Sequence, residues 1–173
     1  MTAVGAPLVG LLKLSSSWRV IAVEQLPAVR VCDAVTRLEH VVAIVAYCQA
    51  VVKLLSERHD RGEKIPSYHR ILTTENKWLA GRYGLEAPLM DLATGRRNRV
   101  AVAQLIRRTL KEIEPHAREL GSDRELEGIE EILRNGNGAD RQLRVFNANR
   151  DIVEVVSEIA DKTEVAAVPT SVS

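Results

Sequence analysis

Residues 36–62 decide the fold, and they read TRLEHVVAIVAYCQAVVKLLSERHDRG. Thr36 is followed three residues later by Glu39, the spacing of a capping box, and Gly62 marks the end of the pattern. We therefore expect a long helix that opens within residues 33–36 and ends at Gly62. The stripe predicted to face the core consists of the apolar residues at helical spacing, Leu38, Val41, Val42, Val45, Val52 and Leu55.

Five more helices are expected after this one. Pro66 suits a first helical turn, and Gly84 can close that helix after Tyr83. Pro88 and Gly95 mark residues 87–99 as a connecting loop. The other helices are predicted from Val102 to Gly121 with a bend at Pro115, from a second capping box at Ser122 and Glu125 to Gly136, from Ala139 to Phe146, and from Asp151 to Asp161 with Ile152, Val155, Val156 and Ile159 facing inward.

Two short β-rich segments precede these helices, Arg19 to Val23 and Ala28 to Cys32, with Pro27 between them. The predicted fold class is therefore α+β and predominantly helical, a short antiparallel strand pair followed by about six helices. A two-stranded ribbon is marginal alone, so this pair needs further strands or helices to complete a sheet.

Composition restricts the classes of function. The 173 residues are 46% hydrophobic and 27% charged, typical of one soluble domain. Basic and acidic residues alternate to a net charge of +1, which disfavours nucleic acid as a partner. The apolar run at 41–52 is shorter than the ~20 residues of a membrane span, and residues 1–14 lack the basic start of an export signal, so we expect a cytoplasmic protein without a membrane partner.

Metal and disulfide chemistry have little support in the sequence. Cys32 and Cys48 are sixteen positions apart without a CxxC pair, which favours two reduced thiols. The four histidines lack metal-ligand spacing and are expected at the surface or at helix ends; they are His40, His59, His69 and His116.

Four motifs carry a resemblance to a known family. The segment ENKWLAGRYGL at 75–85 resembles the ENxWxAxRYGL stretch of the glutamate-cysteine ligase type 2 family. It is flanked by VRVCD at 29–33, similar to the family's ExRxxD strand, by DLATGR at 91–96, similar to its DxxTG loop, and by GADRQ at 138–142. Order and spacing agree from about Ala28 to Asp161, so the resemblance implies the C-terminal half of such a ligase, with a glutamine-synthetase-like fold.

The resemblance implies ATP-dependent chemistry. Such enzymes transfer the terminal phosphoryl group of ATP to the side-chain carboxylate of L-glutamate, and the amine of L-cysteine then attacks the acyl phosphate. ATP and Mg²⁺ are the implied cofactors, because phosphoryl transfer depends on positioning and on neutralising charge. Ala28 stands where the family pattern has a metal-binding Glu, and a methyl group cannot ligate Mg²⁺. No metal-binding residue is therefore assigned.

Three candidate site residues follow from the resemblance. Arg30 matches the arginine of ExRxxD and is the candidate catalytic residue, either meeting phosphate oxygens or pairing with a carboxylate such as Asp33. Asn76 and Arg82 are candidates for nucleotide or substrate binding. In the alternative interpretation Trp78 and Tyr83 anchor the core, and the polar residues of the helix only cap or pair at the surface.

Two functions remain open from the sequence. In the first, residues 18–163 are the C-terminal portion of a ligase catalytic domain, preceded by an unmatched leader at 1–17 and followed by a flexible tail at 164–173. The chain alone is then expected to be inactive, and a partner chain supplying the N-terminal half, or a homo-oligomer, would complete it. In the second, the chain is a non-catalytic truncated product or a helical partner-binding module.

Overall fold

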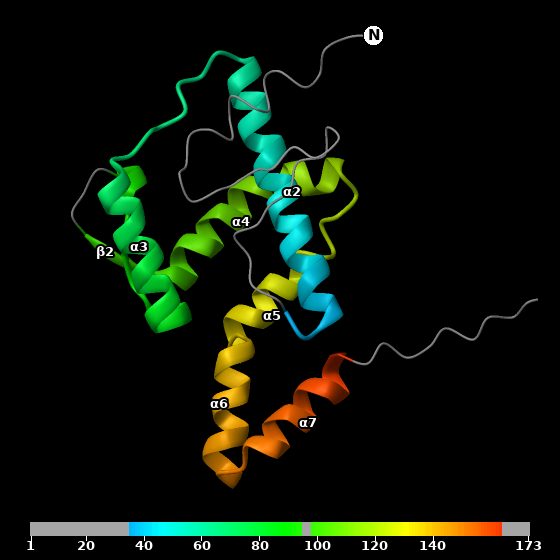
Figure 1. Ribbon diagram of the computed structural model, residues 1–173. Coiled ribbons are helices and arrows are strands. Elements are labelled where there is room, and N and C mark those ends of the chain that lie inside the picture. Colours follow the sequence, from blue (N-terminus) through cyan, green and yellow to red (C-terminus); the bar gives the residue numbers. More distant parts are fainter. Residues whose placement is uncertain (1–34, 95–97, 164–173) are drawn as a thin grey trace, which may run out of the picture.

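The computed structural model describes residues 35–94 and 98–163. The predicted strands at 19–32, the candidate Arg30 and the tail at 164–173 lie outside these residues. Within them the chain forms six α-helices, two short 3-10 turns and one two-stranded antiparallel sheet, which confirms a predominantly helical α+β protein (Figure 1). The helices are α2 (Leu38–Asp60), α3 (Arg70–Tyr83), α4 (Val102–Glu119), α5 (Glu127–Asn135), α6 (Gly138–Asn149) and α7 (Ile152–Thr163).

The sheet lies in the segment that the sequence predicted to be a loop. Strand β1 (Pro88–Met90) pairs antiparallel with β2 (Arg99–Ala101), with Leu89 opposite Val100. Three residues per strand are too few for an alternating pattern to be recognised, which is why Pro88 and Gly95 suggested a loop. Pro88 is tolerated because it is the first residue of its strand in a two-stranded sheet.

Helix α2 covers most of the predicted range but starts at Leu38 rather than within residues 33–36, and its predicted cap and core face are wrong. The N-cap residue is Arg37 rather than Thr36, and the Arg37 guanidinium pairs with Glu39 at 2.6 Å. Leu38 and Val45 of the predicted inner stripe are 54% and 49% exposed. The buried residues of α2 are instead His40, Ala43, Ala46, Ala50 and Leu54.

Close helix packing explains why small residues face the core. Helix α2 crosses α4 and also contacts α5 (Figure 1). A Cβ atom added at Gly128 of α5 would lie 2.7 Å from the Cβ of Ala43, so these two backbones meet where both residues are small. The central core combines residues of α2 and α4 with one that precedes α5: Ala46, Ala50, Leu54, Ile113, Ala117 and Leu126.

Helix α2 is therefore apolar on two sides. Among the described residues it is the one helix whose length and composition would allow it to cross a membrane, a test that a core helix of a soluble protein also passes. Only 28% of its most apolar window is buried against the rest of the structure. The second apolar side, called here the outer stripe, has exposed side chains in the described structure: Leu38, Val41, Val42 and Val45.

At the remaining helix ends the predicted glycine signals are confirmed, but two of the predicted helix starts are wrong. Gly84, Gly121 and Gly136 adopt positive φ angles at helix ends, as expected. Helix α3 starts at Arg70 rather than Pro66, with His69 as its cap. The capping box predicted at Ser122 is wrong, because the Ser122 hydroxyl donates to the Ala117 carbonyl and α5 starts only at Glu127.

The two last helices were predicted only in part. A capping box that the sequence reading missed joins Asn137 and Asp140 at the start of α6. In α7 only Val155 of the predicted inner residues is buried, whereas Ile152 and Val156 are 63% and 59% exposed.

Candidate functional site

The candidate Asn76 has a defined structural partner. Its side-chain amide donates from Nδ2 to the Met90 carbonyl and accepts from the Met90 N–H at Oδ1, both at 2.8 Å. Asn76 thus acts toward β1 as a neighbouring strand would, and it joins the ENKWLAGRYGL helix to the DLATG hairpin. This contact uses one donor and one acceptor of the side chain that the sequence assigned to nucleotide or substrate.

Asp91, the first residue of DLATG, is the most enclosed carboxylate of this region. It is 6% exposed, and its two oxygens accept from the Arg108 guanidinium of α4 at 2.6 and 2.9 Å. Its Oδ1 also accepts from the Ala93 N–H at 3.3 Å. Chiefly through the hydrogen bond from Arg108, the pKa of Asp91 lies below its usual value. The hairpin is thereby fixed to α4 as well as to α3.

The outer face of α3 is aromatic and basic. Trp78 and Tyr83 are 61% and 52% exposed and meet edge to face, with ring centroids 6.2 Å apart. Arg82 is exposed beside them, its guanidinium carbon 6.0 Å from the centre of the Tyr83 ring. The interpretation of Trp78 and Tyr83 as core anchors is therefore wrong. Leu79 is the buried residue of this helix.

The end of α3 contacts the start of α6. Gly84 has φ of +56°, and a Cβ atom placed there would lie 3.1 Å from Nδ2 of Asn137. Asn137 is the N-cap of α6, accepting from the Asp140 N–H at 3.0 Å while the Asp140 carboxylate accepts from the Asn137 N–H at 2.8 Å. In Figure 1 the C-terminal end of α3 approaches the junction of α5 and α6. The RYGL and GADRQ motifs therefore meet in space.

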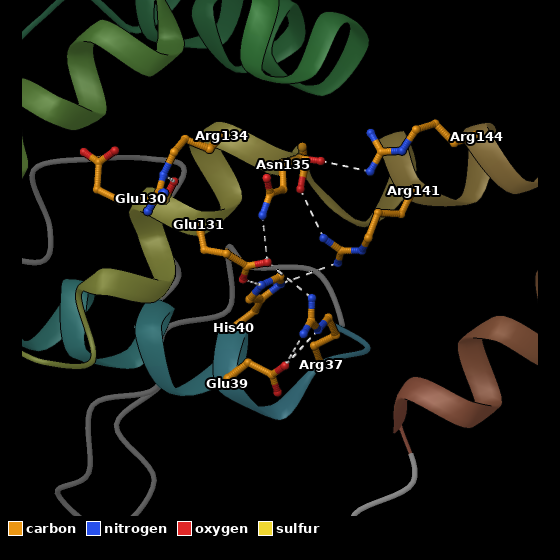
Figure 2. Close-up of polar contacts among 10 residues, drawn as sticks. Arg37, Glu39, His40, Glu130, Glu131, Arg134, Asn135, Arg141 and Arg144 are labelled. Carbon is orange, nitrogen blue, oxygen red and sulfur yellow. Dashed lines mark hydrogen bonds and ion pairs between the residues drawn. The ribbon is translucent and has the colours of Figure 1, made fainter.

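A polar cluster around the buried His40 lies between α2, α5 and α6 (Figure 2). His40 is 1% exposed and lies in the first turn of α2, so of its two predicted positions the helix end is right and the surface is wrong. Its Nε2 bonds the Glu131 carboxylate of α5, and its Nδ1 lies 3.4 Å from Nη2 of Arg141 of α6. Arg37 and Asn135 also bond Glu131, each at 3.3 Å. The hydrogen bond from His40 is the main cause that holds the pKa of Glu131 below its usual value.

Sequence reasoning missed these partners for identifiable reasons. Asp91 and Arg141 were quoted within motifs, but nothing in the spacing joined them to Arg108 and His40, which are 17 and 101 positions away. The one available signal was a polar His40 within the most apolar helix, because a buried polar side chain needs a partner.

The described residues do not assemble a magnesium site. No group of three or more His, Cys, Asp or Glu side chains in the described part of the chain is placed to hold a metal ion. Asp91 has both oxygens on Arg108, which leaves it a poor ligand. A shallow depression of about 330 Å³ between α4 and α5 is lined by charges of both signs and contains none of the motif residues.

These contacts define an α+β segment in which Asn76 bonds the ENKWLAGRYGL helix to the hairpin, and Gly84 lies close to the Asn137 cap of α6. The family model described as glutamate-cysteine ligase family 2 matches residues 16–159. The chain belongs to this family.

Relatives with the assigned name "Putative glutamate--cysteine ligase 2" include one from Solibacter usitatus, 42% identical over 78% of this chain and 34% of the relative. Another, from Sorangium cellulosum, is 38% identical over 78% of this chain and 36% of its own length. The chain thus spans about a third of the curated relatives it matches.

Proposed function

We propose that this chain supplies the helical part of an ATP-dependent carboxylate–amine ligase that joins L-glutamate to an amine such as L-cysteine. In the proposed reaction the γ-phosphoryl group of ATP passes to the glutamate side-chain carboxylate, giving an acyl phosphate and ADP. The amine nitrogen then attacks the acyl carbon, inorganic phosphate leaves, and an amide bond forms. The family membership and the names of the relatives support this reaction class.

One observation carries the proposal to particular residues. The ENKWLAGRYGL helix is anchored at both ends, by Asn76 to Met90 and by Gly84 against Asn137, while Arg82 between them stays exposed. A helix held at two points fixes the backbone position of Arg82, and a guanidinium can bond a phosphate or carboxylate through two parallel N–H donors. We therefore assign Arg82 to substrate or nucleotide contact and Asn76 to positioning. Arg30 stays the proposed catalytic residue.

Magnesium would have to be held mainly by residues other than those described. Phosphoryl transfer requires charge neutralisation around the phosphates, and two carboxylates of the motifs, Asp91 and Glu75, are each paired with an arginine. Arg108 makes two hydrogen bonds to Asp91, whereas Arg99 makes one to Glu75 at 2.9 Å. We assign no step of the reaction to a metal bound by these residues.

The outer stripe of α2 supports a requirement for a further protein portion. An apolar side of a helix is normally buried, yet Val42 and Val45 on the second apolar side of α2 are 42% and 49% exposed. The portion of the relatives that this chain does not match is the proposed cover for this stripe, and we expect it to supply strands and metal-binding carboxylates. The 173-residue polypeptide by itself is then expected not to turn over.

The same stripe supports a second candidate function. A non-catalytic helical module would use Val42 and Val45 to bind a partner chain or a second copy of itself, without any contribution from Arg82. The two functions differ in whether Arg82 matters after assembly.

The test is ADP release with glutamate, cysteine and Mg-ATP. The chain is assayed alone and mixed with the unmatched portion of the Solibacter relative, as wild type, as Arg30→Ala and as Arg82→Ala. Turnover that appears only in the mixture, and that is lost with either substitution, supports the ligase. Assembly without turnover supports the helical module, and full turnover by the isolated chain contradicts the proposed need for a further portion.

A further inference from the structure

A continuous line of contacts connects the buried His40 to the motif turn at Gly84. Arg141 contacts His40 through Nη2 at 3.4 Å and donates from Nη1 to the Gly136 carbonyl at 3.1 Å. Gly136 precedes Asn137, whose side-chain amide lies against Gly84. Figure 2 shows Arg141 reaching from α6 toward His40. One guanidinium thus links α2 to the turn that faces the end of α3.

Arg141 is held between two partners on different elements. Nε2 of His40 faces the Glu131 carboxylate of α5. Nδ1 of His40 lies 3.4 Å from Nη2 of Arg141, and Nη1 of Arg141 donates to the Gly136 carbonyl. The direction of the Arg141 side chain is therefore set by the His40 ring on one side and by the Gly136 carbonyl on the other. The other charged groups at the cluster are Arg37 and Glu39 of α2 itself.

The backbone at Gly84 leaves little room for a side chain. Its φ of +56° favours glycine, and a side chain there would also press on Asn137 at 3.1 Å. Gly136 is similarly confined, because a Cβ atom added to it would lie 2.8 Å from the Cβ of Asp140. Since Arg82 and Tyr83 immediately precede Gly84, a shift of the Asn137 turn that displaces Gly84 would act directly on the exposed end of α3.

We propose that His40 and Arg141 are positioning residues that set the orientation of Arg82 and Tyr83 through the Gly136–Asn137 turn and Gly84. The assignment of a purpose to Arg82 rests on the proposed ligase function, but the mechanical link does not. The link therefore has a readout that needs no substrate.

That readout is the edge-to-face pair of Trp78 and Tyr83, which contributes to the near-UV circular dichroism of the folded protein. A Trp18→Phe background leaves Trp78 as the single tryptophan. Arg141→Lys keeps the charge but cannot reach His40 and Gly136 in the same forked geometry. The matched control is Arg118→Lys on α4, where the guanidinium bonds Glu114 of the same helix at 2.7 Å.

We expect Arg141→Lys to change the near-UV spectrum and the quenching of Trp78 while the far-UV spectrum stays that of the parent. His40→Gln, which retains a donor for Glu131, is expected to produce the same change. The double variant is expected to match Arg141→Lys alone, because that substitution already breaks the His40–Arg141 contact that His40→Gln removes. Arg118→Lys is expected to leave the spectra unchanged.

A glycine pair tests the last step of the link. Gly84→Ala is compared with Gly121→Ala, since both residues have positive φ but a Cβ atom at Gly121 meets nothing within 4 Å. Only Gly84→Ala is expected to change the Trp78 signal. If Arg141→Lys and His40→Gln behave like Arg118→Lys while Gly84→Ala changes the signal, the positioning role is overturned. The spectra are recorded without ATP or amino acids, so that result would leave the ligase proposal intact. Likewise, a failure of the turnover assay would not affect the interpretation of the spectra.

Discussion

The side chain of Asn76 bonds both the N–H and the carbonyl of Met90, fourteen residues further along the chain. A primary amide offers a donor and an acceptor at the spacing of a peptide group, so Asn76 substitutes for one residue of a third strand beside β1. A two-stranded sheet of three-residue strands would be marginal without such support. The most specific family motif therefore has a structural task in addition to any contact with substrate.

Asn76→Asp is the sharpest change at this contact. The carboxylate still accepts from the Met90 N–H, but its second oxygen then faces the Met90 carbonyl without a donor. We expect a loss of about 1–3 kcal/mol in the free energy of unfolding, measured by urea denaturation, and faster hydrogen exchange of the Met90 amide. Lys77→Gln, at the exposed neighbouring position, serves as the control. Unchanged hydrogen exchange at Met90 would show that the two Asn76–Met90 hydrogen bonds do not protect this strand.

The Asp91–Arg108 pair is expected to matter more than the Glu75–Arg99 pair. Asp91 is enclosed and accepts two hydrogen bonds from Arg108, whereas Glu75 and Arg99 are 44% and 46% exposed. We expect Asp91→Asn to cost about 1–3 kcal/mol in urea denaturation and Glu75→Gln less than about 1 kcal/mol. A double-mutant cycle with Arg108→Gln should show coupling between Asp91 and Arg108. Strictly additive effects would contradict the bidentate contact.

Acid is expected to weaken the junction of α2, α5 and α6. The pKa of Glu131 is lowered in the folded chain, mainly by its hydrogen bond with His40. A lowered carboxyl pKa stabilises the folded state above the unfolded pKa, about 4.3 for Glu, and this contribution disappears as pH falls through the folded value. Glu131→Gln should therefore flatten the loss of stability below about pH 4 in chemical denaturation. Glu127→Gln on the same helix should retain the parental acid dependence.

Substitutions on the two apolar sides of α2 are expected to differ in their effect on the free energy of unfolding and on assembly. Val42→Glu changes an exposed residue and should alter the free energy of unfolding of the chain by no more than about 0.5 kcal/mol. Ala46→Leu overfills the contact with α4 and should cost about 1–3 kcal/mol. Mixed with the unmatched portion of a relative, Val42→Glu should fail to assemble. Normal assembly by sedimentation would exclude this stripe as the interface.

Sequence patterns predicted the helical class and most helix ends, because glycines with positive φ leave a local signal at Gly84, Gly121 and Gly136. They failed on which side of α2 is buried. Valine is more hydrophobic than alanine, but Ala43 is buried because its small side chain allows α5 to approach at Gly128. Which side of α2 is buried therefore depends on the partner helix, and the pattern of one helix alone does not determine it.

The candidate site was predictable only as far as its motifs. ENKWLAGRYGL, DLATG and GADRQ are local strings, and their family resemblance is confirmed by the match over residues 16–159. Their contacts with the neighbouring helices are made by Asp91 with Arg108 of α4 and by Arg141 with His40 of α2. A single sequence records neither pair, because these partners are joined by tertiary packing rather than by a repeated spacing.

The central claim is that this chain works as the helical part of a ligase. Its most direct test replaces the matched third of the Solibacter relative with residues 16–159 of this chain and measures glutamate- and cysteine-dependent ADP release. The account predicts turnover comparable to that of the intact relative, lost on Arg82→Ala and retained on Lys77→Gln. A soluble, folded chimera without turnover, beside an active parent, would contradict it.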